Sequence, residues 1–330
     1  MRVGLFVDLR NPPGWRRPWQ QHYDVVLDRL TAAEELGIDS IWLTEHHLFK
    51  DGYLSQPLTF AAALAVRTRR ARLGTAILQA PLRPAIDIAE QATLVDILSG
   101  GRLELGLGAG YRLPEWNAFG ADGLRRYELL EERAREIRNM WDDGALTPPP
   151  VQARPPIWIG GEGPRAARMA GRLGEGLLAL LPALLPIYRE SLERSGHDPA
   201  SARMAGCANL ILADDPERAW SIIRPHLDYQ WNSYAMYAAE GTSSSPEHLD
   251  PDRLRTDGFP ILPRFVVTTP QDAARRLHEW LDPLPVEYVY FWDSIAAMPD
   301  ELAIRHAHLL ATELAPLLLA PAPAGASSPG

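Results

Sequence analysis

Short runs of apolar residues alternate along the chain with longer segments whose apolar residues follow helical spacing. The runs have the length of β-strands and lie at 3–7, 40–43, 73–78, 103–107, 157–159, 177–180, 208–212 and 286–292. The helical segments lie at 20–36, 58–68, 85–97, 125–141, 164–172, 184–195, from 216 onward, at 271–281 and at 301–319. Strands and helices that alternate at this spacing require parallel strands joined by right-handed crossovers. The pattern therefore predicts an α/β fold, a closed (β/α)8 or TIM barrel with insertion loops.

The predicted barrel forms one domain over residues 1–319. The segment 241–258 is polar and is the longest candidate for a mobile loop. The last residues, 320–330, are rich in proline, alanine, glycine and serine, so we expect a disordered tail.

Composition excludes several classes of function. The formal net charge is −9, which argues against binding to nucleic acid because phosphate contacts need clustered Lys and Arg. The chain has a single cysteine, so an internal disulfide is impossible. No apolar run reaches the roughly 18 residues that a membrane helix needs, and the first residues read as a strand rather than a signal peptide. We expect a cytoplasmic protein with no membrane contact.

Polar residues and glycines gather where three of the predicted strands end. Those residues are Thr44, Glu45, His46, His47, Gln79, Gly108, Gly110 and Tyr111. Carboxyl ends of parallel strands are where α/β folds place their sites, so we expect this group to form one.

The adjacent histidines His46 and His47 are the first candidates for chemistry. Side chains alternate along a strand, so one of them should point into the barrel and the other towards the helices. A structural role with Glu45 as partner is the competing interpretation. A metal site is disfavoured, because two adjacent histidines cannot face one ion on a regular strand and His306 and His308 point apart on a helix.

Two glycine-rich segments could approach a flat or anionic ligand. The segment GLGAG at 106–110 is followed by residues that break a helix, so it is no dinucleotide fingerprint. The segment IWIGGEGP at 157–164 leads from a strand through glycines into a helix. Free N–H groups at such a helix start can hold a phosphate, helped by Arg165, although a plain glycine turn is the alternative.

Five motifs in order resemble the bacterial luciferase-like family of flavin-dependent monooxygenases. They are TEHH, LGTAIL, AEQATLVDILSGG, RLELGLGAGY and PPIWIGGEGP, and the similarity runs from residue 1 to about residue 176. The resemblance implies that His46 assists proton transfer and that Ala76 and Ile77 form a non-proline cis peptide against the flavin ring. It places the ring near Gly108, Ala109, Gly110 and Tyr111, and the phosphate at Gly160, Gly161, Glu162, Gly163 and Pro164. Luciferase has a reactive cysteine where this chain has Gly108, so light emission is not expected.

The function that the resemblance implies is a monooxygenase that uses reduced FMN and O2 to oxygenate a small organic substrate. A separate flavin reductase would supply the reduced FMN, the protein would be a homodimer, and 241–258 would be the lid. For the other aromatic residues, Trp116 and Phe119 are the better pocket candidates. Trp231, Tyr234 and Tyr237 share one helix face and fit the core or a dimer contact better than a substrate. Cys207 reads as a small core residue.

Two alternatives stay open. One is a deazaflavin-dependent oxidoreductase that transfers hydride without oxygen; many such relatives carry an SDH-type motif where this chain has TEHH. The other is a flavin-binding relative without catalysis.

Overall fold

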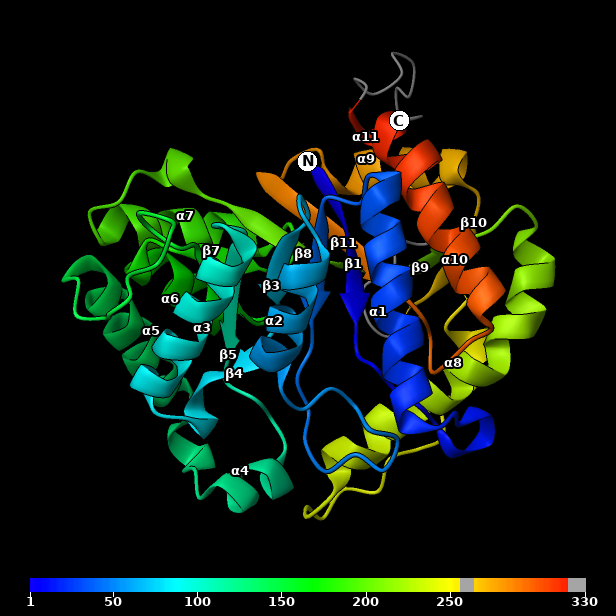
Figure 1. Ribbon diagram of the computed structural model, residues 1–330, viewed down its shortest axis with the longest axis horizontal. Helices are drawn as coiled ribbons and strands as arrows, with labels where there is room; N and C mark the ends of the chain where they lie inside the picture. The colour runs from blue at the N-terminus through cyan, green and yellow to red at the C-terminus, as the bar shows by residue number, and fades with distance from the viewer. Residues whose placement is uncertain (256–263, 320–330) are drawn as a thin grey trace.

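The computed structural model describes residues 1–255 and 264–319, and its centre is a closed barrel of parallel strands (Figure 1). The barrel strands are β1 (Arg2–Val7), β2 (Ser40–Leu43), β3 (Arg72–Thr75), β5 (Leu103–Gly108), β6 (Ile157–Gly160), β7 (Gly176–Leu178), β8 (Met204–Ala208) and β11 (Val286–Trp292). They are ordered β3-β2-β1-β11-β8-β7-β6-β5, and a pairing between β3 and β5 closes the ring. The prediction of a (β/α)8 barrel is confirmed. The predicted tail, 320–330, lies outside the described residues.

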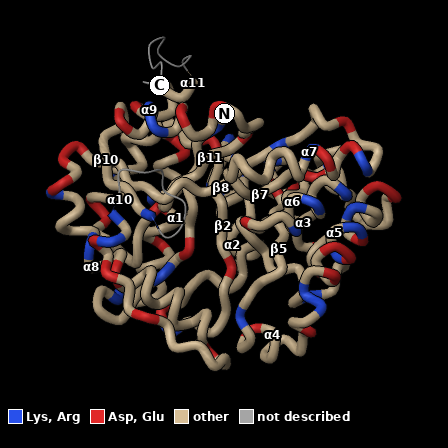
Figure 2. Tube along the Cα trace, turned by 180° about the vertical axis from the view of Figure 1, so that it is seen from behind, with Lys and Arg blue, Asp and Glu red and all other residues tan. Residues whose placement is uncertain are grey.

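Helices surround the barrel on all sides (Figure 1). The outer helices are α1 (Trp19–Leu36), α2 (Pro57–Arg67), α3 (Ala85–Ser99), α5 (Arg126–Asp142), α6 (Pro164–Leu173), α7 (Leu184–Arg194), α8 (Pro216–Ala239), α9 (Pro270–Leu281), α10 (Asp300–Leu309) and α11 (Ala315–Leu319). Several begin with proline, whose missing N–H is harmless in a first turn. Gly37 and Gly100 end α1 and α3 with φ of 114° and 69°, a conformation that favours glycine. Figure 2 shows the charged residues mainly on these outer elements.

Three predicted elements differ from the observed ones. The predicted strand at 73–78 is interrupted, since β3 ends at Thr75 and β4 (Leu78–Gln79) follows a cis peptide between Ala76 and Ile77. The predicted strand at 208–212 is misplaced: the barrel uses β8, whereas β9 (Leu210–Leu212) pairs with β10 (Val266–Thr268). Both runs are short and apolar, so periodicity cannot tell which of them enters the barrel. The segment 112–122, for which the pattern predicts neither a strand nor a helix, contains a helix, α4 (Leu113–Phe119).

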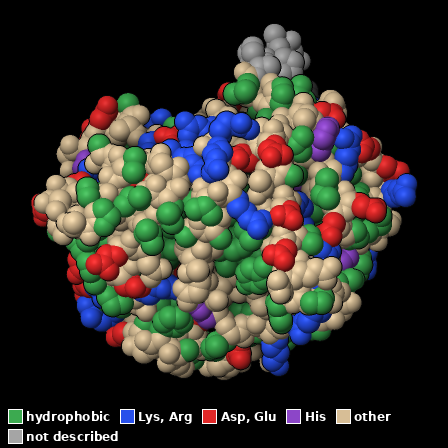
Figure 3. Space-filling model, viewed as in Figure 1, with side chains coloured by type: hydrophobic (Ala, Val, Ile, Leu, Met, Phe, Trp, Pro, Cys, Tyr) green, Lys and Arg blue, Asp and Glu red, His purple; other side chains and the backbone are tan. Residues whose placement is uncertain are grey.

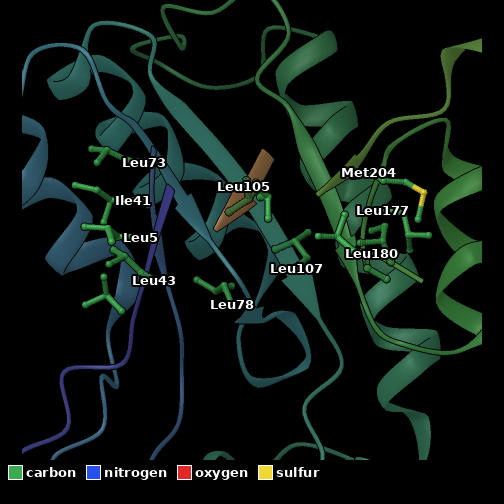
Figure 4. Close-up of a cluster of buried hydrophobic side chains, with 14 of the residues drawn as sticks. Leu5, Ile41, Leu43, Leu73, Leu78, Leu105, Leu107, Leu177, Leu180 and Met204 are labelled. Carbon is green, nitrogen blue, oxygen red and sulfur yellow. The ribbon is translucent and has the colours of Figure 1, made fainter. Parts of the chain in front are cut away.

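Successive residues of the barrel strands belong to different apolar clusters, because side chains of a strand alternate. Leu5, Ile41 and Leu73 come from neighbouring strands and lie together in the cluster that also contains helix residues (Figure 4). Trp42 instead packs with Trp158 in a second cluster inside the barrel.

Glycines make room for the two interior tryptophans. A Cβ on Gly74 would lie 2.3 Å from the ring of Trp42, and one on Gly176 would lie 2.3 Å from the ring of Trp158. Glycines and tryptophans therefore complement each other inside the barrel, so that its interior is filled by side chains.

The last helical stretch, Asp300–Leu319, is long and apolar enough to cross a membrane by length and composition, and within the described residues it alone meets that test. This differs from the expectation drawn from the sequence. In the structure the stretch packs on α1, α9 and β9, and Ala303, Ala307, Leu310 and Leu314 are buried. Its apolar side therefore contacts the barrel.

On the face of the molecule shown in Figure 3, acidic, basic and neutral side chains are interspersed.

Candidate functional site

A cavity of about 780 Å³ opens at the carboxyl ends of the barrel strands. Its wall is largely aromatic and includes Phe6, Tyr53, Tyr111, Tyr127, Trp231, Tyr234, Trp280, Tyr290 and Trp292. Most of the predicted site residues also line it, namely His46, Ala76, Ile77, Gly108, Ala109, Gly110, Tyr111, Gly160, Gly161 and Glu162. Gly163 and Pro164 are not in its wall; Gly163 is instead the N-cap of α6. The structure thus brings together residues that lie at the carboxyl ends of four barrel strands, β2, β3, β5 and β6.

His46 is held on both ring nitrogens. Its Nδ1 lies 2.9 Å from Oε1 of Glu115, and its Nε2 lies 3.1 Å from the hydroxyl of Tyr111. Because an ionised carboxylate only accepts hydrogen bonds, Nδ1 is the nitrogen that carries a proton in the neutral ring. In that tautomer Nε2 keeps its lone pair, on the ring edge beside Tyr111. His47 points elsewhere and lies 2.8 Å from Glu45, as the alternation predicted.

Glu115 is the central acceptor of this site, and the sequence did not point to it. It is fully buried and accepts hydrogen bonds from His46, the backbone N–H of His47, Gln79 and Arg112. Burial opposes its ionisation, but the hydrogen bond and charge of His46, with the other donors, outweigh this and lower its pKa to about 2. Glu115 is therefore a carboxylate at neutral pH, and it fixes the orientation of His46.

Arg112 ties this pair to the end of α8. Its guanidinium donates to the carbonyls of His47 at 2.6 Å and Tyr237 at 3.0 Å, and to the carboxylate of Glu240 at 2.6 Å. The side chain has no exposed surface. The C-terminal end of α8, which forms one wall of the cavity, is thereby joined to the segment that orients His46.

The stability of the protein should depend on pH through Glu115. Its pKa is lower in the folded protein than the ordinary 4.5, so its contribution is present above about pH 5 and is lost as the pH falls towards 2. We expect Glu115→Gln to lower the free energy of unfolding by about 3 kcal/mol at pH 7 and by much less at pH 3. Urea titrations of both proteins at the two pH values measure this difference. An equal difference at both pH values would refute the assignment.

Two glycines form a cradle under Ile77. A Cβ on Gly160 would lie 2.2 Å from Cγ2 of Ile77, and a Cβ on Gly108 would lie 2.5 Å from its Cγ1. Only glycine leaves Ile77 in this position, where it and Ala76 line the cavity. The cis peptide between Ala76 and Ile77 is present, as the family resemblance implies.

The residues of the cavity fit a flavin. The cradle presents a flat apolar surface, and Oε1 of Gln79 is a buried acceptor without a hydrogen-bond partner beside Gly110. At the other end, the glycine segment leads into the first turn of α6, where free N–H groups favour an anion. Arg165 lies there, stacked at 4.4 Å on the ring of Tyr127. Within the described ranges, no lysine or arginine lines the cavity.

Two expectations about the cavity wall, those for Trp116 and Phe119, are corrected. Trp116 and Phe119 do not line the cavity, because α4 turns them towards Arg126 and His47. Trp231 and Tyr237 are members of buried apolar clusters and Tyr234 packs against them, as expected of core residues, and Trp231 and Tyr234 also line the cavity. Periodicity cannot separate a helix face that meets a core from one that meets a cavity.

Cys207 also lines the cavity rather than only filling the core. Burial raises the pKa of its thiol well above the ordinary value, so it stays protonated. Of the predicted lid at 241–258, residues 256–258 lie outside the described residues, and Leu249 reaches the cavity. In the part of the chain that the structure describes, no group of three or more His, Cys, Asp or Glu could hold a metal ion.

Comparison with known proteins gives a consistent picture. Residues 1–285 match the family described as luciferase-like monooxygenase. An F420-dependent glucose-6-phosphate dehydrogenase of Kineococcus radiotolerans is 29% identical over 290 residues, covering 77% of this chain and 83% of that protein. The oxygenase component of a flavin-dependent trigonelline monooxygenase of Acinetobacter baylyi is 29% identical over 190 residues, covering 53% of this chain and 52% of that protein.

Among solved structures, the monooxygenase RslO1 from Streptomyces bottropensis superposes with a TM-score of 0.75 at 23% identity, covering 96% of this chain and 99% of that one. At this identity the likeness shows the shared fold. The relatives in sequence include both flavin-dependent monooxygenases and F420-dependent dehydrogenases, which are oxidoreductases. With its barrel closed and most of its length matched, the chain belongs to the luciferase-like monooxygenase family.

Proposed function

We propose that this protein is a flavin-dependent monooxygenase that uses reduced FMN and O2 to oxygenate a small organic substrate. The observation that carries the proposal is the position of His46, oriented by a buried carboxylate at the mouth of a cavity whose floor is the glycine cradle under Ile77. Bound reduced FMN would supply the electrons that activate O2. Gly160 and Gly108 would bring its ring onto Ala76 and Ile77, and Gly161 to Pro164, with Arg165, would hold its phosphate.

His46 acts in this proposal as the group that holds or moves a proton at Nε2. The Nδ1–H bond to Glu115 keeps the ring in one tautomer, and Glu115 stabilises the imidazolium when Nε2 takes up a proton. Tyr111 is the neighbour of Nε2 and can pass a proton onward. Its own pKa is raised by burial, so it acts as a neutral donor at physiological pH.

The aromatic wall serves to exclude water from the reacting atoms. Phe6, Trp231, Tyr290 and Trp292 line the side that would receive the substrate. We propose that the described part of the expected lid, 241–255, closes over this side, and that a separate reductase supplies the reduced FMN, as the oxygenase component among the relatives suggests. We also propose that the protein forms a homodimer.

A second candidate is hydride transfer with a deazaflavin in the same cavity. The similarity to an F420-dependent glucose-6-phosphate dehydrogenase, which covers 77% of the present chain, favours this candidate. The TEHH sequence at 44–47 weighs against it. In that reaction His46 would still hold a proton, but O2 would take no part.

The proposal is tested by titrating the purified protein anaerobically with photoreduced FMN and then mixing it with oxygenated buffer in a stopped-flow spectrometer. We expect reduced FMN to bind tightly. After mixing with oxygen, we expect a transient absorbance band that lasts longer than the band given by free reduced FMN in the same buffer. Parallel titration with a reduced deazaflavin is the control. Binding of the deazaflavin with no binding of FMN would replace the monooxygenase by the second candidate.

A further inference from the structure

Asn209 lies between β8 and β9 and lines the cavity across the ring from β3, the strand that leads to Ile77. In the ring of strands, β8 is separated from β3 by β11, β1 and β2 on one side and by β7, β6 and β5 on the other. A flavin on the cradle would therefore leave this side of the cavity to the substrate.

The orientation of the Asn209 amide is set by its neighbours. Nε1 of Trp292 lies 3.0 Å from Oδ1, and an indole N–H can only donate, so the atom that it meets must be the oxygen. The thiol of Cys207 approaches the same oxygen at 3.7 Å. The amide nitrogen, Nδ2, is left facing away from Trp292.

Nδ2 carries two N–H donors that have no hydrogen-bond partner among residues 1–255 and 264–319. The residue is only 4% exposed, and it lines the cavity. Nδ2 is not among the described side-chain atoms that are both fully buried and unpaired, so it is open to the cavity, where water or a ligand can accept from it. An acceptor atom of a ligand bound in the cavity would pair with these two N–H donors.

The rest of this wall limits the charge and shape of such a ligand. Phe6, Trp231 and Trp292 present apolar ring surfaces, which favour a planar compound. No lysine or arginine of the described chain lines the cavity, and its wall contains the carboxyl of Glu162. An anionic substrate would find no counter-charge there.

We infer that Asn209 determines substrate specificity, by donating from Nδ2 to a carbonyl oxygen or ring nitrogen of an uncharged, planar, largely apolar substrate. This inference rests on the proposed function, because it names the class of compound that the same site would oxidise. It concerns the chain's own residues and requires no particular flavin.

Isothermal titration calorimetry of the flavin-free protein with three compounds of similar size tests the inference. The compounds are acetophenone, which has a carbonyl acceptor, ethylbenzene, which lacks it, and benzoate, which is anionic. We expect acetophenone to bind at least tenfold more tightly than the other two. Equal binding of acetophenone and ethylbenzene, absence of binding by all three, or preference for benzoate would overturn the inference.

Two variants connect the preference to Asn209. Asn209→Asp keeps an oxygen for Trp292 and removes the amide donors, and Asn209→Leu removes them without adding charge. Both should lose the tenfold preference for acetophenone, whereas Asn139→Asp, on the exposed side of α5, should keep it. Circular dichroism verifies folding, and a preference that survives in either folded variant refutes the role of Asn209. Because no flavin is present, failure of the FMN experiment and failure of this one are separate results.

Discussion

Replacing His46 by alanine is expected to lower turnover by a factor of about 100 or more, with little change in the affinity for reduced FMN. The expected loss is the usual contribution of a positioned acid or base, and it follows from the placement of Nε2 at the cavity beside Tyr111. Turnover is measured by steady-state kinetics with a substrate of the class inferred above. The affinity for reduced FMN is measured separately by anaerobic titration.

His47→Gln is the matched control, because His47 is the adjacent histidine and lies outside the cavity wall. It should keep most of the activity if its bond to Glu45 is only structural. Full turnover in His46→Ala would remove His46 from the mechanism.

Gly160→Ala is expected to weaken FMN binding at least tenfold. The added methyl would lie 2.2 Å from Cγ2 of Ile77, a distance that real contacts do not reach, so Ile77 must move into the space above the cradle. A forced shift of this kind also costs about 1–3 kcal/mol of stability. Fluorescence titration with FMN and urea unfolding measure the two effects.

The double variant Gly160→Ala with Ile77→Ala tests the cause. Removing the Ile77 side chain relieves the clash, so flavin affinity should recover relative to the single variant. Gly14→Ala is the control, since Gly14 lies outside the cavity wall and a Cβ there meets no atom within 4 Å. If Gly160→Ala binds FMN as tightly as the unmodified protein, the cradle is not where the ring lies.

The sequence by itself determined the class of fold and the end of the barrel that carries the site. Eight apolar runs alternating with helices allow few parallel arrangements, and the polar residues after each strand meet at one rim whatever the register. His46 and Gly108 were identified in this way, because their position depends on the local strand, whereas Ala76 was identified through the family resemblance. Local periodicity misplaced a strand between 204 and 212, where two apolar runs compete for one place in the barrel.

Only the tertiary structure decided which partners these residues have. Glu115 meets His46 across 69 residues, and Asn209 meets Trp292 across 83, and neither pair has a spacing that a sequence pattern can express. The tautomer of His46 and the free donors of Asn209 are properties of these contacts. They arise when the barrel closes and buries polar groups together, because a buried donor or acceptor must then find its partner among whatever residues the closed ring places beside it.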